Sequence, residues 1–147
     1  MCWHGKLENR KIATEDLKCY KIVLKFSYEP FFRPYYRCNK SPIIYEVGKT
    51  YYGVICPAKV IEDTDLITIH EGIHCYDLSV LICKFYKDKY EVKYLLPHGV
   101  FLNLGTFSSR TYCKAVLMEC TIPKGTIYYM NDKGEIVTEK LIINKVV

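Results

Sequence analysis

Residues 70 to 74 read His-Glu-Gly-Ile-His, and here the residue types and spacing of the chain come closest to a catalytic motif. On an α-helix, His70 and His74 would share one face and bind zinc, and Glu71 would serve as the general base of a metallohydrolase. On a strand that runs into a turn, the same spacing carries no chemistry. The local secondary structure therefore decides whether a zinc hydrolase is indicated.

The residues before and inside this segment favour a strand and a turn. Leu66 to Ile69 includes three β-branched residues, and Gly72 inside a helix would cost about 1 kcal/mol relative to alanine. Asp77, a good helix N-cap, follows the second histidine instead of preceding the first. No third residue that could bind zinc lies at a spacing typical of a zinc site with His70 and His74. We therefore expect neither a metal site nor a catalytic residue here.

Other catalytic patterns are absent from the sequence. His74 and Cys75 are adjacent, so on a strand their side chains would point to opposite faces and could not act as a base and its nucleophile. None of the four histidines belongs to a His-x-Thr or His-x-Ser pair, and no glycine-rich phosphate loop is present. We expect a protein that has no cofactor and is a binder rather than an enzyme.

Cysteine content and hydropathy bear on the compartment. The eight cysteines include no Cys-x-x-Cys pair, and the first residues lack the apolar core of a secretion signal. No apolar run approaches the roughly 20 residues of a membrane span. Cysteines of intracellular proteins stay reduced and pack as small hydrophobic side chains. We expect free thiols, a cytoplasmic location and no membrane partner.

The excess of basic residues is mild and spread along the chain. Lys and Arg number 21 against 16 Asp and Glu, which gives a formal charge of +5. Proteins that bind duplex nucleic acid concentrate such residues on one face or along one helix. We therefore expect a small anionic ligand rather than duplex nucleic acid.

The segment Tyr28–Lys40 combines aromatic and basic side chains. Its aromatic residues could stack on a base, and Arg33 and Arg37 could fork around a phosphate. Alternatively, it is a proline-rich loop that covers the end of a sheet with aromatic side chains. Both interpretations stay open at this stage.

Alternating and β-branched stretches predict a sheet-rich domain with one helix. We expect a short helix at about 77–88, a hairpin turn at 131–134, and strands at 17–27, 43–45, 49–55, 66–70, 90–96, 112–122, 125–130 and 135–147. The length suits a single domain, residues 1–147. The predicted fold class is α+β with mostly antiparallel sheet.

Several segments resemble a family of small uncharacterised proteins from bacteria and their phages. They are Met1–His4, Tyr45–Tyr51, Gly72–Tyr76 and Glu119–Tyr129 together with Gly134–Val137. This resemblance implies no known activity.

Two stretches also resemble the ADP-ribosyltransferase fold. The stretch from Gly72 to Tyr86 is similar to a strand and following helix of that fold, and Ala115–Tyr128 is similar to its strand with a Pro-Lys-Gly turn. The resemblance implies that Tyr20 and Lys21 lie where the first strand contacts nicotinamide nucleotides. That position lacks the His-Gly or Arg-Gly pair of active members, and Glu139 is the sole candidate for the catalytic glutamate. These departures imply a degenerate member that keeps the fold without the chemistry.

The combined prediction is a phage-type accessory protein that sequesters a small anionic nucleotide, such as an ADP-ribose-like or cyclic immune signal, in the host cytoplasm. The alternatives are an ADP-ribosyltransferase-like enzyme acting on NAD, a zinc hydrolase through His70 and His74, and a protein-interaction module. Homo-oligomerisation stays open. Aromatic residues for the base and cations for the phosphate make up the candidate site, which consists of Tyr20, Lys21, Arg33, Arg37, Tyr45, Lys49, His74 and Tyr76.

Overall fold

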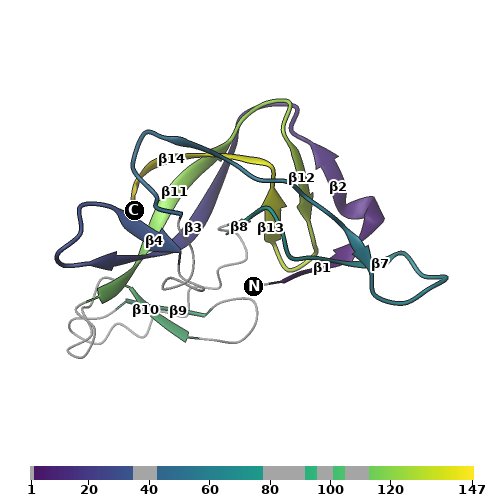
Figure 1. Ribbon diagram of the computed structural model, residues 1–147, viewed down its shortest axis with the longest axis horizontal. Coiled ribbons are helices and arrows are strands. Elements are labelled where there is room, and N and C mark those ends of the chain that lie inside the picture. The colour runs from purple at the N-terminus through teal and green to yellow at the C-terminus, as the bar shows by residue number, and fades with distance from the viewer. Residues whose placement is uncertain (1, 35–42, 78–91, 96–100, 105–112) are drawn as a thin grey trace.

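The computed structural model describes residues 2–34, 43–77, 92–95, 101–104 and 113–147. Within these ranges the chain forms two sheets, and the only helical element is a 3-10 helix at Leu7–Asn9. Figure 1 shows β1 and β7 of the smaller sheet on the right-hand side, and β3 and β11 of the larger sheet toward the left.

The larger sheet has a central path of strands with two side branches. The order along the path is β2 (Arg10–Ile12), β12 (Ile127–Met130), β13 (Glu135–Thr138), β8 (Ile73–Tyr76), β3 (Leu17–Phe26), β11 (Cys113–Ile122), β10 (Phe101–Leu104) and β9 (Val92–Leu95). On the branches, β4 (Phe32–Pro34) pairs with β3, and β14 (Lys140–Val146) pairs with β11 and with β5 (Thr50–Tyr52). Among the described strands, every pair is antiparallel except β10 with β11.

The long ladder between β3 and β11 forms the centre of this sheet. Its register runs from Leu17 opposite Ile122 to Phe26 opposite Cys113. Both strands are rich in β-branched and apolar residues, which fit a pleated surface that is covered by other side chains. Cys19 and Cys120 face each other across the ladder and are fully buried in the main hydrophobic core.

The smaller sheet packs against the larger one through a second hydrophobic core. Its order is β1 (Trp3–Lys6), β7 (Leu66–Ile69) and β6 (Ala58–Lys59). Trp3 is 1% exposed, contacts the ring of Tyr129 edge-on, and donates its indole N–H to the carbonyl of Glu135 at 2.7 Å. This tryptophan therefore fastens the first strand to the larger sheet.

The predicted α+β class is wrong, because the described residues form a mostly β fold. Of the predicted helix at 77–88, residues 78–88 lie outside the described residues, and Asp77 follows β8 directly. The strands predicted at 17–27, 66–70 and 112–122 are confirmed to within a residue of each end. The strand predicted at 135–147 is divided at Glu139 into β13 and β14.

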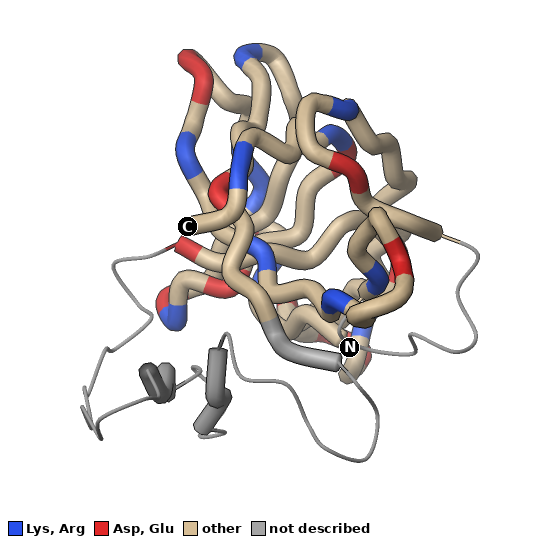
Figure 2. The backbone as a smooth tube through the Cα atoms, turned by 90° about the vertical axis from the view of Figure 1, so that its left-hand side faces the viewer, with Lys and Arg blue, Asp and Glu red and all other residues tan. Residues whose placement is uncertain are grey.

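Charged residues of both signs are interspersed along the described chain (Figure 2). None of the helical structure in the described part is long and apolar enough to cross a membrane.

Candidate functional site

The His-Glu-Gly-Ile-His segment forms the end of one strand, a turn and the start of the next strand. His70 follows β7, His74 lies within β8, and Gly72 between them has a φ angle of +95°. A right-handed helix requires a φ near −63°, so this backbone is not helical. The prediction of a strand and a turn is confirmed. Among the described residues, no group of three His, Cys, Asp or Glu side chains is placed to hold a metal ion.

Gly72 has a packing role at this turn. A Cβ atom added there would lie 2.8 Å from Val137 Cγ2 and 3.2 Å from Ile55 Cγ1. A Cβ atom on Gly53 would lie 3.0 Å from the Cα of Gly72, so two backbone segments cross closely at these glycines. The segment that leaves β5 therefore passes directly over the turn between the two sheets.

Lys21, Tyr45 and the backbone of His74 come together beside the main core. The Lys21 ammonium donates to the carbonyl of His74 at 2.7 Å and lies 5.2 Å from the centroid of the Tyr45 ring. Tyr45 in turn packs edge-on against Tyr51, with ring centroids 4.9 Å apart. The partner of Lys21 is thus a carbonyl group and not the His74 imidazole.

The other members of the predicted site on β3 and β8 are Tyr20, His74 and Tyr76, and they lie on the face of the sheet opposite to Lys21. Tyr20 pairs with Tyr76 across β3 and β8, and His74 lies two residues before Tyr76, so alternation places these three side chains together. Lys21 is adjacent to Tyr20 and therefore points the other way. Burial lowers the pKa of His74 to about 4, with a smaller contribution from nearby Lys21. The imidazole is neutral near pH 7 and supplies no cation for a phosphate.

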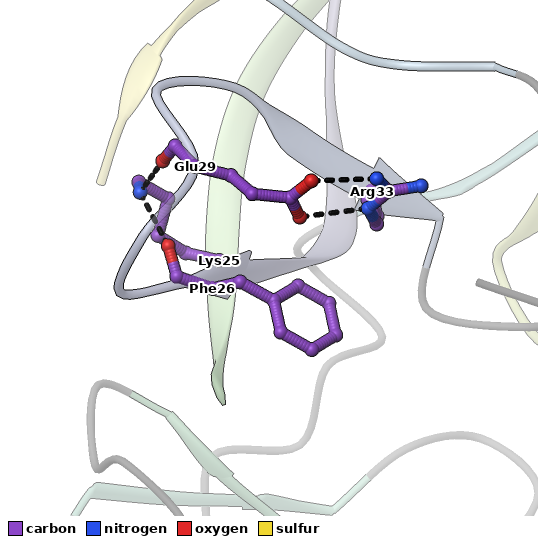
Figure 3. A network of polar contacts seen from close by, with 4 residues as sticks. All are labelled: Lys25, Phe26, Glu29 and Arg33. Atoms are coloured by element: carbon purple, nitrogen blue, oxygen red, sulfur yellow. Dashed lines mark hydrogen bonds and ion pairs between the residues drawn. The ribbon is translucent and has the colours of Figure 1, made fainter. Parts of the chain in front are cut away.

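Arg33 is held at the base of the β3–β4 turn by an acidic partner (Figure 3). Its guanidinium donates two hydrogen bonds to the carboxylate of Glu29, at 2.7 and 2.5 Å, and this contact lowers the pKa of Glu29. Lys25 bonds to the carbonyls of Phe26 and Glu29 in the same turn. Arg37, the second predicted arginine, lies outside the described residues.

Lys49 also has an acidic partner close to it in the chain. Its ammonium lies 2.5 Å from the Glu46 carboxylate, and their hydrogen bond raises the pKa of Lys49. The Tyr51 hydroxyl accepts a bond from the Glu46 backbone N–H at 2.6 Å. The described cations of the predicted site therefore all bond to protein groups that a phosphate would have to displace.

The strand β5 has an open edge that the sequence did not predict. Among the described strands, β5 pairs only with β14, in a register that places Tyr51 opposite Leu141. The Gly53 N–H donates to the Glu139 carbonyl, and the Ile143 N–H donates to the Lys49 carbonyl. Residues 49, 51 and 53 thus face β14, and alternation turns the N–H and C=O groups of Thr50, Tyr52 and Val54 toward the open edge.

The side chains along this edge are exposed and apolar. Tyr52 is 74% exposed and Val54 is 70% exposed, whereas Tyr51 and Ile55 between and beyond them are partly buried. The β-favouring residues of 49–55 predict a strand, but they do not reveal on which side that strand lacks a neighbour.

Comparisons of the chain with protein-family models, with curated proteins and with solved structures gave no significant match.

Proposed function

We propose that this protein is a protein-interaction module that binds an extended segment of a partner protein along the open edge of β5. The observation that carries this proposal is the edge itself, where Thr50, Tyr52 and Val54 direct backbone donors and acceptors away from β14. An extended peptide can add to such an edge as a further strand, with affinity from main-chain hydrogen bonds and specificity from alternate side chains.

The exposed side chains define the chemistry of the partner. Tyr52 and Val54 lie on one face of the strand, so the matching strand would carry apolar residues at alternate positions. The edge at β2, at the far end of the sheet, is less suited, since it presents Arg10 and Lys11, and charged edges resist strand addition. Five described cysteines are free, which supports placing this interaction in the reducing cytoplasm as part of the proposal.

Selection of short peptides from a displayed library tests this function. Selected peptides should alternate apolar residues and should lose binding to a Val54→Pro variant, because proline removes the N–H donor at the open edge. The fold should tolerate this change, since proline is accepted on the outer side of an edge strand. Ile12→Lys, an exposed apolar residue on β2, is the matched control and should bind normally. Peptides that bind the Val54→Pro variant as tightly as the parent would overturn the proposal.

Sequestration of a nucleotide stays a second prediction. Lys21, Tyr45 and Tyr51 bring a cation and aromatic rings together, although the Lys21 ammonium bonds to the His74 carbonyl and Tyr45 is buried. Calorimetric titration with ADP-ribose and cyclic nucleotides tests this prediction. If a nucleotide binds, Lys21→Ala or Arg37→Ala should weaken its affinity roughly tenfold or more, because each removes a charge-assisted donor. Absence of binding below about millimolar concentration would exclude this function.

A further inference from the structure

Cys2 and His70 form a hydrogen-bonded pair that the sequence gives no reason to expect. The β1–β7 register places Trp3 opposite Ile69, so the residues just outside the ladder, Cys2 and His70, are also opposite each other. The Cys2 Sγ lies 2.8 Å from the His70 Nδ1. His70 is exposed and Cys2 is partly exposed, so the pair is accessible to molecules in solution.

The surrounding contacts hold both residues in place. Trp3, next to Cys2, is buried and bonded to the Glu135 carbonyl. The carbonyl of His70 accepts a hydrogen bond from the ring Nε2 of His74 at 3.2 Å. The backbones of Cys2 and His70 are therefore held next to each other, at the end of the paired strands β1 and β7.

The other described cysteines lack this combination of access and a neighbouring base. Cys19, Cys75 and Cys120 are buried, and burial raises the pKa of the Cys120 thiol to about 12. The pKa of Cys19 is also raised, by its hydrogen bond to Cys75 and by burial. Cys56 is exposed but has no hydrogen bond to an imidazole among the described residues, and so it provides an internal reference thiol.

We propose that Cys2 and His70 form an activated thiol pair at which the protein reacts covalently with small disulfides. The thiolate is the nucleophile in such exchange, and an adjacent imidazole promotes its formation by accepting the thiol proton. The Cys2 sulfur attacks one sulfur of the disulfide, the new S–S bond forms as the old one breaks, and the leaving thiolate takes the proton from His70. One disulfide and one protein thiol thus give one mixed disulfide and one free thiol.

Time-resolved peptide mapping of the native protein with oxidised glutathione near pH 7 tests this. Cys2 should form the mixed disulfide about tenfold faster than Cys56. The rate at Cys2 should also fall less steeply than the rate at Cys56 when the pH is lowered, because the His70 imidazole accepts the thiol proton. Equal rates and parallel pH profiles at the two cysteines would overturn the proposal without the need for any variant.

Two variants separate activation from accessibility. His70→Gln keeps a polar side chain at the position but removes the base, and the rate at Cys2 should fall about tenfold toward that of Cys56. His4→Gln removes another exposed imidazole, which lies on β1 and has no bond to Cys2, and should leave the rate unchanged. An unchanged Cys2 rate in His70→Gln would refute the role of His70.

Discussion

Gly72 illustrates how a single residue decides between a helix, on which His70 and His74 would share one face, and a turn. Its φ of +95° is a conformation that residues with a Cβ atom rarely adopt, and its surroundings leave no room for a Cβ. Of the histidines on either side, His70 therefore follows one strand and His74 lies within the next. Sequence reasoning identified the glycine as unfavourable for a helix, but the close approach of Gly53 and Val137 depends on contacts far apart in the chain.

Gly72→Ala should lower the free energy of unfolding by about 2–4 kcal/mol, from strain at positive φ and from the contact with Val137. Gly48→Ala is the matched control, because Gly48 has a φ of +87° but nothing within 4 Å of an added Cβ. Gly48→Ala should lower the free energy of unfolding only through the strain at positive φ, by about 1 kcal/mol. Urea denaturation of both variants measures the difference, and equal losses would contradict the packing role of Gly72.

Burial of His74 predicts a dependence of stability on pH. The folded-state pKa is lowered to about 4, whereas the unfolded chain binds a proton near pH 6.5. The contribution of the neutral, buried His74 to the free energy of unfolding is therefore complete above pH 6.5 and is lost as the pH falls toward 4. Between about pH 7.5 and pH 5 the loss should be on the order of 2 kcal/mol.

Urea denaturation of the parent and of His74→Gln at the two pH values tests this dependence. The substitution should remove most of the change in the free energy of unfolding between them. His4→Gln replaces an exposed histidine and should preserve it. The same slope in His74→Gln as in the parent would show that burial of this ring is not the cause.

At the scale of elements, β3 connects the core to the predicted site. The apolar and β-branched residues of β3 and of its partner β11 are sufficient to predict both strands, because each strand is long. Lys21 was expected to face a ligand, but its ammonium bonds to the His74 carbonyl and lies over Tyr45. The sequence could not show this, because the acceptor is a backbone atom on a strand that pairs with β3 only in the folded chain.

Lys21→Ala should therefore destabilise the protein by about 2 kcal/mol, from the lost charge-assisted hydrogen bond and the lost contact with the ring. Lys18→Ala on the same strand is the control. Lys18 is 63% exposed and pairs with Glu119 at the surface, so its removal should change stability by less than about 1 kcal/mol. Thermal unfolding compares the two, and an unchanged stability for Lys21→Ala would mean that this lysine is available to a ligand.

At the scale of the whole molecule, two sheets share a second core through Trp3 and Val137, and the chain from β5 to β7 joins them. The free side of β5 follows from this arrangement, since β14 is the only described strand that pairs with β5. Local periodicity predicts strands but not their neighbours, so neither the open edge nor the Cys2–His70 pair could be found from the sequence.

Amide hydrogen exchange at residues 50–54, with and without a selected peptide, tests the open edge most directly. In the free protein, the amides of Tyr51 and Gly53 should be protected by β14, and those of Thr50, Tyr52 and Val54 should exchange rapidly. Bound peptide should slow the exchange of the second group at least tenfold and leave the first group nearly unchanged. Protection of Tyr52 and Val54 already in the free protein, or no protection on peptide binding, would contradict strand addition at β5.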